Sequence, residues 1–299
     1  MAATEHADIE TEPLRPARRH AFVHALLASR KASFGLAIVL IIVIAAALSP
    51  LLAPYSPEFQ RLGARLLPPF SIAEGHLHAF GTDQLGRDIL SRLIYGARVS
   101  LLIGVSASLL AGTFGISLGL IAGYFGGRTD DVIMRLSDVQ LALPYILVAL
   151  AILAIVGNSL FNIILVLSGT QWVTYARVIR SGVLSVKEQE YVQAARTLGL
   201  TNTRIILRYV LPNVFAPAIV IATFSVAQTI VAEAGLSFLG LGVPPSVPSW
   251  GAMLADGRTY LVVAWWLVTI PGLAISLTVI GVNLFGDWLR DYLDPKLRV

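Results

Sequence analysis

Long runs of apolar residues recur along this chain, and within each run the apolar residues are continuous instead of alternating with polar ones. A helix needs about 20 apolar residues to cross the roughly 30 Å hydrocarbon core of a bilayer. Six runs meet this requirement, at residues 34–53, 99–122, 139–156, 160–181, 214–233 and 261–284. Continuous runs exclude the alternating pattern of a membrane β-barrel. The pattern therefore predicts an all-α polytopic membrane protein with six transmembrane helices.

The polar stretches divide the chain further. Residues 1–33 form a polar N-terminal tail, residues 34–289 the six-span domain, and residues 290–299 a short C-terminal tail. Within the six-span domain, a loop of residues 54–98 follows the first run, and a segment of residues 182–213 follows the fourth. No internal repeat is visible, which argues against the inverted-repeat secondary carriers.

Composition and charge agree with a surface that faces lipid. The chain is 56% hydrophobic and 13% charged, whereas a soluble domain carries about 25% charged residues. The six-span topology places 16 of the 22 Lys and Arg residues on the side of the two termini. The positive-inside rule therefore predicts that both termini are cytoplasmic and that the 54–98 loop is external, although five arginines in this loop oppose it. Because no basic stripe with interleaved aromatic residues is present, we expect membrane lipid and not nucleic acid as a partner.

Several kinds of reactive site are missing from the sequence. The chain has no cysteine, and none of its three lysines follows a glycine, so a Walker A phosphate loop cannot form. His76 and His78 belong to no HExxH pair, and we interpret them as part of a solvated loop. Residues 167–171 superficially resemble the ABC signature peptide, but they lie inside the fourth run. We therefore expect no catalytic residue, no metal and no cofactor bound by this chain.

The polar segment after the fourth run has the pattern of a helix, a break and a second helix. A series of helix-forming residues, 186–198, ends at Gly199, a common helix terminator, and Thr201 or Asn202 can cap the next helix. This pattern predicts a compact protrusion in which Ala194 and Ala195 allow close approach of another protein. An ordinary solvated helical loop is the alternative.

Small residues recur every four positions in the second run, at Ala107, Ala111, Gly115, Gly119 and Gly123. Such a ridge lets helix backbones approach closely in lipid. We expect it to pack against another helix, either in this chain or in a partner subunit.

Glu233 lies at the end of the fifth run, where a carboxylate costs a few kcal/mol unless it is paired or faces water. Two interpretations are open. The residue lines a pathway or gate, or it forms a structural pair with a loop arginine such as Arg258. Asp138, just before the third run, is interpreted as a helix cap.

The spacing in the 182–213 segment resembles a known motif. Gln193-Ala194-Ala195, then Gly199 and later Leu211-Pro212 resemble the EAA loop of ABC importer permeases, with Gln193 in place of the usual glutamate and Tyr209 in place of the usual isoleucine. The resemblance implies that this loop docks in a cleft of a separate ATPase subunit. The implied coupling residues are Tyr191, Gln193, Ala194, Ala195, Arg196 and Gly199.

Four further motifs, at residues 80–98, 236–245, 248–251 and 286–295, are similar to dipeptide and oligopeptide permeases of the "C" type. The resemblance covers residues 30–296 and implies a type I ABC importer with a MetI-like transmembrane domain in a bacterial inner membrane. It also implies a homologous sister permease, a solute-binding protein, and two ATPase domains that bind ATP and Mg²⁺. The implied cargo is a peptide. Nickel, glutathione or another small solute is the alternative, and an ion-coupled secondary transporter is a rival from another class.

The motif at residues 80–98 also has the pattern of an amphipathic interfacial helix, with Thr82 or Asp83 as its cap. In that helix Arg87, Asp88 and Arg92 would face water or a partner. One interpretation is packing against the chain's own spans. The other is that Asp83, Arg87, Asp88 and Arg92 help to receive the solute-binding protein.

Overall fold

The computed structural model describes residues 18–293, with side chains from Phe22 onward. Residues 1–17 and 294–299, and with them most of the two predicted tails, lie outside the described residues. The described chain is mostly helical, as predicted. Its helices are α1 (Arg18–Ala28), α2 (Arg30–Ala47), α3 (Ser49–Leu52), α4 (Ile89–Phe125), α5 (Gly127–Leu141), α6 (Tyr145–Val156), α7 (Leu160–Val186), α8 (Glu190–Thr197), α9 (Asn202–Ile205), α10 (Leu211–Phe238), α11 (Trp250–Gly257) and α12 (Trp266–Leu293).

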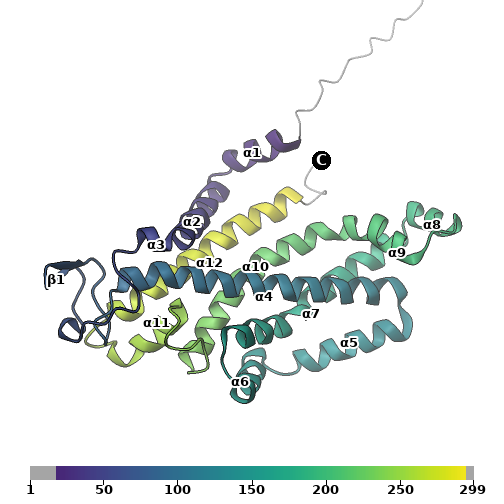
Figure 1. Ribbon diagram of the computed structural model, residues 1–299. Helices are drawn as coiled ribbons and strands as arrows, with labels where there is room; N and C mark the ends of the chain where they lie inside the picture. The colour runs from purple at the N-terminus through teal and green to yellow at the C-terminus, as the bar shows by residue number, and fades with distance from the viewer. Residues whose placement is uncertain (1–17, 294–299) are drawn as a thin grey trace, which may run out of the picture.

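Short elements complete the fold. Strands β1 (Ser71–Ala73) and β2 (His76–His78) form an antiparallel hairpin within the 54–98 loop. One turn of π-helix, Ile206–Val210, joins α9 to α10. Figure 1 shows α4 running through the middle of the molecule, with the β-hairpin and α11 near one end and α8 and α9 near the other. Helix α4 packs on α7 and α10, and α2 packs on α12.

The contact between α4 and α7 is formed by the predicted ridge of small residues. A methyl group on Gly115 would lie 2.4 Å from the carbonyl oxygen of Trp172, and one on Gly119 would lie 2.6 Å from that of Ala176. One on Gly123 would lie 2.7 Å from Cβ of Val183. The ridge therefore packs closely, as predicted, and its neighbour is in this chain.

Length and composition identify the candidate membrane spans in the described part of the chain. Among residues 18–293, α2, α4, the continuous segment Asn202–Phe238 and α12 are long and apolar enough to cross a membrane. Helices α5 and α6 would make a fifth span together, but they are bent by 87°. Helix α7 has 27 residues, about 40 Å at 1.5 Å per residue, although polar residues such as Gln171 interrupt it. Six spans remain a prediction.

The third predicted span, residues 139–156, is wrong as a single straight helix. Helix α5 ends at Leu141 and α6 begins at Tyr145. Pro144 accounts for the break, because a proline disfavours helical backbone in the residue before it and has no N–H to donate. Asp138 does not cap this span either. It lies within α5, where its Oδ1 accepts a hydrogen bond from Nη2 of Arg177 at 2.5 Å.

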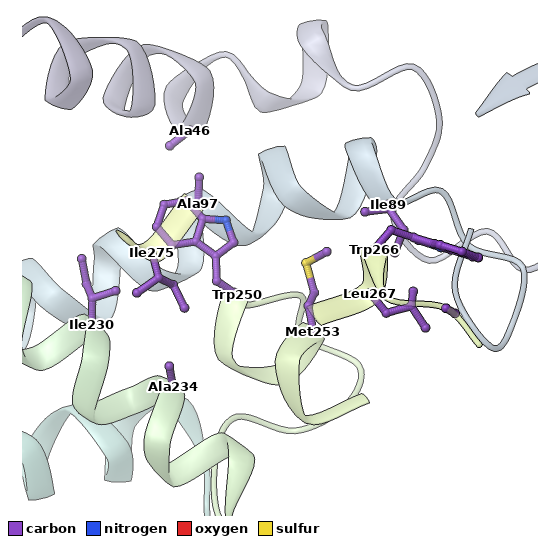
Figure 2. Packing of buried hydrophobic residues seen from close by; sticks show 11 residues of the cluster. Ala46, Ile89, Ala97, Ile230, Ala234, Trp250, Met253, Trp266, Leu267 and Ile275 are labelled. Atoms are coloured by element: carbon purple, nitrogen blue, oxygen red, sulfur yellow. The ribbon is translucent and has the colours of Figure 1, made fainter. Parts of the chain in front are cut away.

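Helix α11 lies between α10 and α12 along the chain and is held by an apolar cluster. Figure 2 shows Trp250 of α11 beside Ala97 of α4, with Ile230 of α10 and Ile275 of α12 in the same cluster. The indole Nε1 of Trp250 donates to the carbonyl oxygen of Leu93 at 2.9 Å. This helix is therefore anchored directly to α4.

A leucine at Gly119 is expected to destabilise the chain, because its side chain would overlap the backbone of α7. Overpacking of this kind costs about 1–3 kcal/mol, so the midpoint of thermal unfolding in detergent should fall by on the order of 5 °C. The control is Gly169→Leu on α7, where an added Cβ has no neighbour within 4 Å. Equal midpoints for the two variants would contradict the close α4–α7 contact.

Candidate functional site

The 182–213 segment forms the predicted helix, break and second helix. The first helix, α8, begins at Glu190 and is shorter than the predicted residues 186–198. After it, Gly199 takes a positive φ of 74°. The N–H of Leu200 donates to the carbonyl of Ala195 at 3.2 Å, and that of Gly199 to Arg196 at 2.9 Å. This pair of bonds is a Schellman motif, which ends α8 and reverses the chain.

The structure separates the six predicted coupling residues into an outer and an inner set. Tyr191, Ala194, Arg196 and Gly199 are exposed on the surface of the protrusion. Ala195 is buried, so the prediction that both alanines are open to another protein is wrong for this one. Ala195 belongs to a cluster that includes residues of α4, α7 and α10.

Polar contacts also attach the protrusion to the long helices. Gln193 is half-buried, and its Nε2 donates to the carbonyl of Lys187 at 2.9 Å. The Nζ of Lys187 in turn donates to the carbonyl of Gly123 near the end of α4 at 3.0 Å. The guanidinium of Arg196 lies 5.0 Å from the ring centre of Tyr124, also on α4. The protrusion is therefore fixed to α4 at several points, and Lys187 is a residue that the sequence analysis missed.

The four predicted residues of the 54–98 loop are all buried, so the prediction that Arg87, Asp88 and Arg92 face water or a partner is wrong. There is no separate interfacial helix, because α4 begins at Ile89 and continues through the predicted second span. Oδ2 of Asp83 accepts from Nε of Arg87 at 2.5 Å and from Nη1 of Arg92 at 2.6 Å.

Both arginines also reach Asp256 at the end of α11, at 3.2 Å from Arg87 and 3.3 Å from Arg92. Asp256 was missed by the sequence analysis, since nothing in the local sequence connects it to residues 83–92. Buried ion pairs are costly to break, because each partner left alone is an uncompensated buried charge. The cluster therefore joins the 54–98 loop to α11.

Asp88 forms a second buried cluster at the N-terminus of α4. Its Oδ2 accepts from the backbone N–H of Ser91 at 2.8 Å, which makes Asp88 the helix cap in place of the predicted Thr82 or Asp83. Its Oδ1 lies 2.9 Å from Nδ1 of His78 on β2. His78 is buried, so its assignment to a solvated loop is wrong. The β-hairpin is therefore attached to the start of α4.

Glu233 of α10 is buried beneath α11. Its Oε1 accepts from the hydroxyls of Ser237 at 2.7 Å and Ser249 at 3.0 Å. Ser249 is the N-cap of α11, since its hydroxyl also accepts from the N–H of Ala252. The predicted pair with Arg258 is wrong, because Nη1 of Arg258 donates to the carbonyl of Phe238 instead. Glu233 therefore connects α10 to the start of α11.

Comparison with known protein families agrees with the motifs. The family model described as "binding-protein-dependent transport system inner membrane component" matches residues 115–299. A second model, described as the N-terminal transmembrane domain of oligopeptide transport permease C, matches residues 19–69.

Curated relatives are similar over most of their length. The chain is 47% identical to the di/tripeptide transport system permease protein DppC of Pseudomonas aeruginosa, over 88% of each chain. It is 44% identical to the dipeptide permease DppC of Bacillus subtilis, over 90% of this chain and 83% of the relative. It is 39% identical to the probable D,D-dipeptide permease DdpC of Escherichia coli, over 96% of each.

Among solved structures, the chain resembles the MetNI methionine ABC transporter in an inward-facing conformation, with a TM-score of 0.55 and 16% identity over 68% of this chain and 96% of the other. At this identity the likeness shows a shared fold, the MetI-like transmembrane domain. The long family match and the close relatives together show that the chain is a multi-pass permease subunit, and it belongs to the family of binding-protein-dependent transport system inner membrane components.

Proposed function

We propose that this chain is one permease subunit of an ATP-driven importer of dipeptides and oligopeptides, and that the protrusion around α8 docks on an ATPase subunit. The observation that carries the proposal is the exposed surface of Tyr191, Ala194, Arg196 and Gly199, on a protrusion attached to α4 by Lys187 and Arg196. A surface that docks on a motor must be open to it and firmly joined to the spans that it moves.

The proposed transport cycle needs further subunits, which complete the solute path and hydrolyse ATP. A homologous sister permease forms the second half of the solute path, and two ATPase domains bind and hydrolyse ATP with Mg²⁺. Their closure would pull on the protrusion, and its contacts with α4, α7 and α10 would carry the movement to the spans. Both termini and the protrusion then lie in the cytoplasm. A solute-binding protein delivers cargo to the 54–98 loop and α11 on the opposite side.

The cargo is proposed from the relatives, whose names include dipeptide, di/tripeptide and D,D-dipeptide transport. Nickel, glutathione or another small solute is the alternative within the same architecture. Competition uptake in cells that carry the whole transporter separates these. Excess unlabelled dipeptide should suppress uptake of a labelled dipeptide, whereas Ni²⁺ and glutathione should not.

The buried residues of the 54–98 loop have an indirect part in this function. Asp83, Arg87, Asp88 and Arg92 hold the loop in shape. The exposed side chains of Ile72 on β1 and of Phe70 just before it are available to the binding protein. We therefore propose that the surface of the hairpin contacts the binding protein. The ionic clusters keep the loop folded.

A cysteine placed at Ala194 should crosslink to an ATPase subunit in the intact membrane. The chain has no native cysteine, so a single photoreactive maleimide group marks one position only. The control is Phe70→Cys, exposed just before β1. Capture of an ATP-hydrolysing subunit from Ala194 and not from Phe70 is expected. Equal capture, or none from Ala194, would refute the docking role.

The turn at Gly199 provides a second test. Gly199→Val forces a β-branched residue into left-handed backbone, which costs about 1–2 kcal/mol, and should lower transport-coupled ATP hydrolysis at least fivefold. Gly199→Asn is the matched control, because asparagine tolerates this backbone, and it should keep most of the activity. Coupled hydrolysis that is the same in both variants would show that the shape of this turn is not needed.

Glu233 is proposed to hold α11 in place and not to bind solute. Glu233→Gln keeps a side-chain oxygen for the hydroxyls of Ser237 and Ser249, and should leave peptide uptake within about twofold of the wild type. Glu233→Ala removes the acceptor of two buried hydrogen bonds and should lower uptake at least fivefold. Loss of uptake in the glutamine variant would assign the carboxylate itself a role in the pathway.

A further inference from the structure

Three cavities lie in sequence along α7, α10 and α12, and they share lining residues. The largest, about 740 Å³, and a smaller one of about 250 Å³ are both lined by Gln171, Thr174, Phe224 and Gln228. Phe224 also lines a third cavity of about 620 Å³ that extends toward Asn213 near the start of α10. Asn283 of α12 faces the largest cavity. We call Gln171, Thr174, Gln228 and Asn283 the polar furrow.

The polar furrow lies near the middle of the helices that carry it. Gln171 is about 16 Å along α7 from Leu160, and Gln228 is about 15 Å from the end of α10 at Phe238. With a hydrocarbon core of about 30 Å, these side chains lie close to the bilayer midplane. Glutamine and asparagine side chains at this depth hydrogen-bond across helices or line a water-filled cavity, and are not turned to lipid. This face of the chain is therefore turned toward water or another protein.

One member of the furrow is held in place by other polar residues. Nε2 of Gln171 donates to the hydroxyl of Thr229 at 2.8 Å, and its Oε1 accepts from Ser225. An amide has two N–H donors and two lone pairs on its oxygen, so Gln171 keeps one donor and one lone pair for a further partner.

The other members have their hydrogen-bonding groups free. Gln228 and Thr174 are exposed, and neither side chain hydrogen-bonds another residue in the described range 22–293. All four side chains of the polar furrow are uncharged. The nearest charges on the lining are Asp287 in the largest cavity and Arg290 in the third, both toward the end of α12. Asp287 is one helical turn from Asn283, whereas Gln171, Thr174 and Gln228 offer amide and hydroxyl groups with no charged side chain among them.

We infer that the polar furrow is this chain's share of the solute path, and that its amides and hydroxyl hydrogen-bond the backbone N–H and C=O groups of a peptide. The inference rests on the proposed function, since the peptide comes from there. Uncharged groups that both donate and accept match every peptide bond, whatever the side chains of the cargo. Without a charge at mid-depth, acidic and basic peptides meet the same surface.

Labelling tests whether the furrow holds water. Single cysteines replace Gln228 or Thr174 in the assembled transporter in membrane vesicles, and a charged methanethiosulfonate reagent measures their accessibility. The control is Leu109→Cys, on an exposed apolar position of α4. Modification at residues 228 and 174 is expected to be at least tenfold faster than at residue 109. Rates equal to the control would mean that this face packs against another subunit in an interface that excludes water, and would overturn the inference.

Uptake measurements test whether the polar furrow hydrogen-bonds the backbone of the peptide. Gln228→Leu and Thr174→Val each remove one hydrogen-bonding group, and should weaken the apparent affinity for Ala-Ala, Asp-Ala and Lys-Ala by a similar factor of about threefold to tenfold. Thr113→Val on α4 is the control, because its hydroxyl bonds only to the carbonyl of Leu109 on the same helix. An effect limited to one charge class, or none, would overturn the backbone assignment. If the wild-type transporter takes up no peptide, the proposed function fails, and the labelling still decides whether the furrow is a water-filled path.

Discussion

The close contact between α4 and α7 is the constraint on which the rest of this structure depends. Gly115, Gly119 and Gly123 bring the two backbones so near that a single methyl group would overlap the facing helix. In lipid, where apolar side chains gain little by leaving their surroundings, such close packing is a main source of helix association. The contact also fixes the rotation of α7. Because Trp172 and Ala176 face the ridge, Thr174 turns toward the opposite, open side of α7.

The same long helix joins the two functional ends of the chain. At its start, Asp88 caps α4 and contacts His78 of the hairpin. At its end, the carbonyl of Gly123 accepts from Lys187, beside the protrusion around α8. The protrusion is therefore connected to the start of α4 through one continuous helix, Ile89–Phe125. This continuity is what the proposed docking of an ATPase subunit on the protrusion requires.

The sequence predicts well those features that depend on local pattern. The apolar runs locate the long helices, the four-residue spacing of small residues predicts the α4–α7 ridge, and Gly199 predicts the reversal after α8. The errors arise where a partner is distant in the chain. Arg92 was placed on an exposed face because Asp256, one of its two carboxylate partners, lies more than 160 residues away. Pro144 is a local signal for the break between α5 and α6. The apolar residues on both sides of it nevertheless give the pattern of one continuous span.

Two of the loop arginines that oppose the predicted topology have a structural role in the folded chain. Of the five arginines in the 54–98 loop, Arg87 and Arg92 are buried. Arg87 and Arg92 share Asp83 and Asp256 in one buried cluster, with two carboxylates for two guanidinium groups. That cluster is neutral as a whole. The positive-inside rule counts Lys and Arg and gives little weight to Asp and Glu, so the cluster leaves the predicted count at 16 against six. What the cluster changes is the folded loop, which it ties to α11 by buried ion pairs that are costly to break.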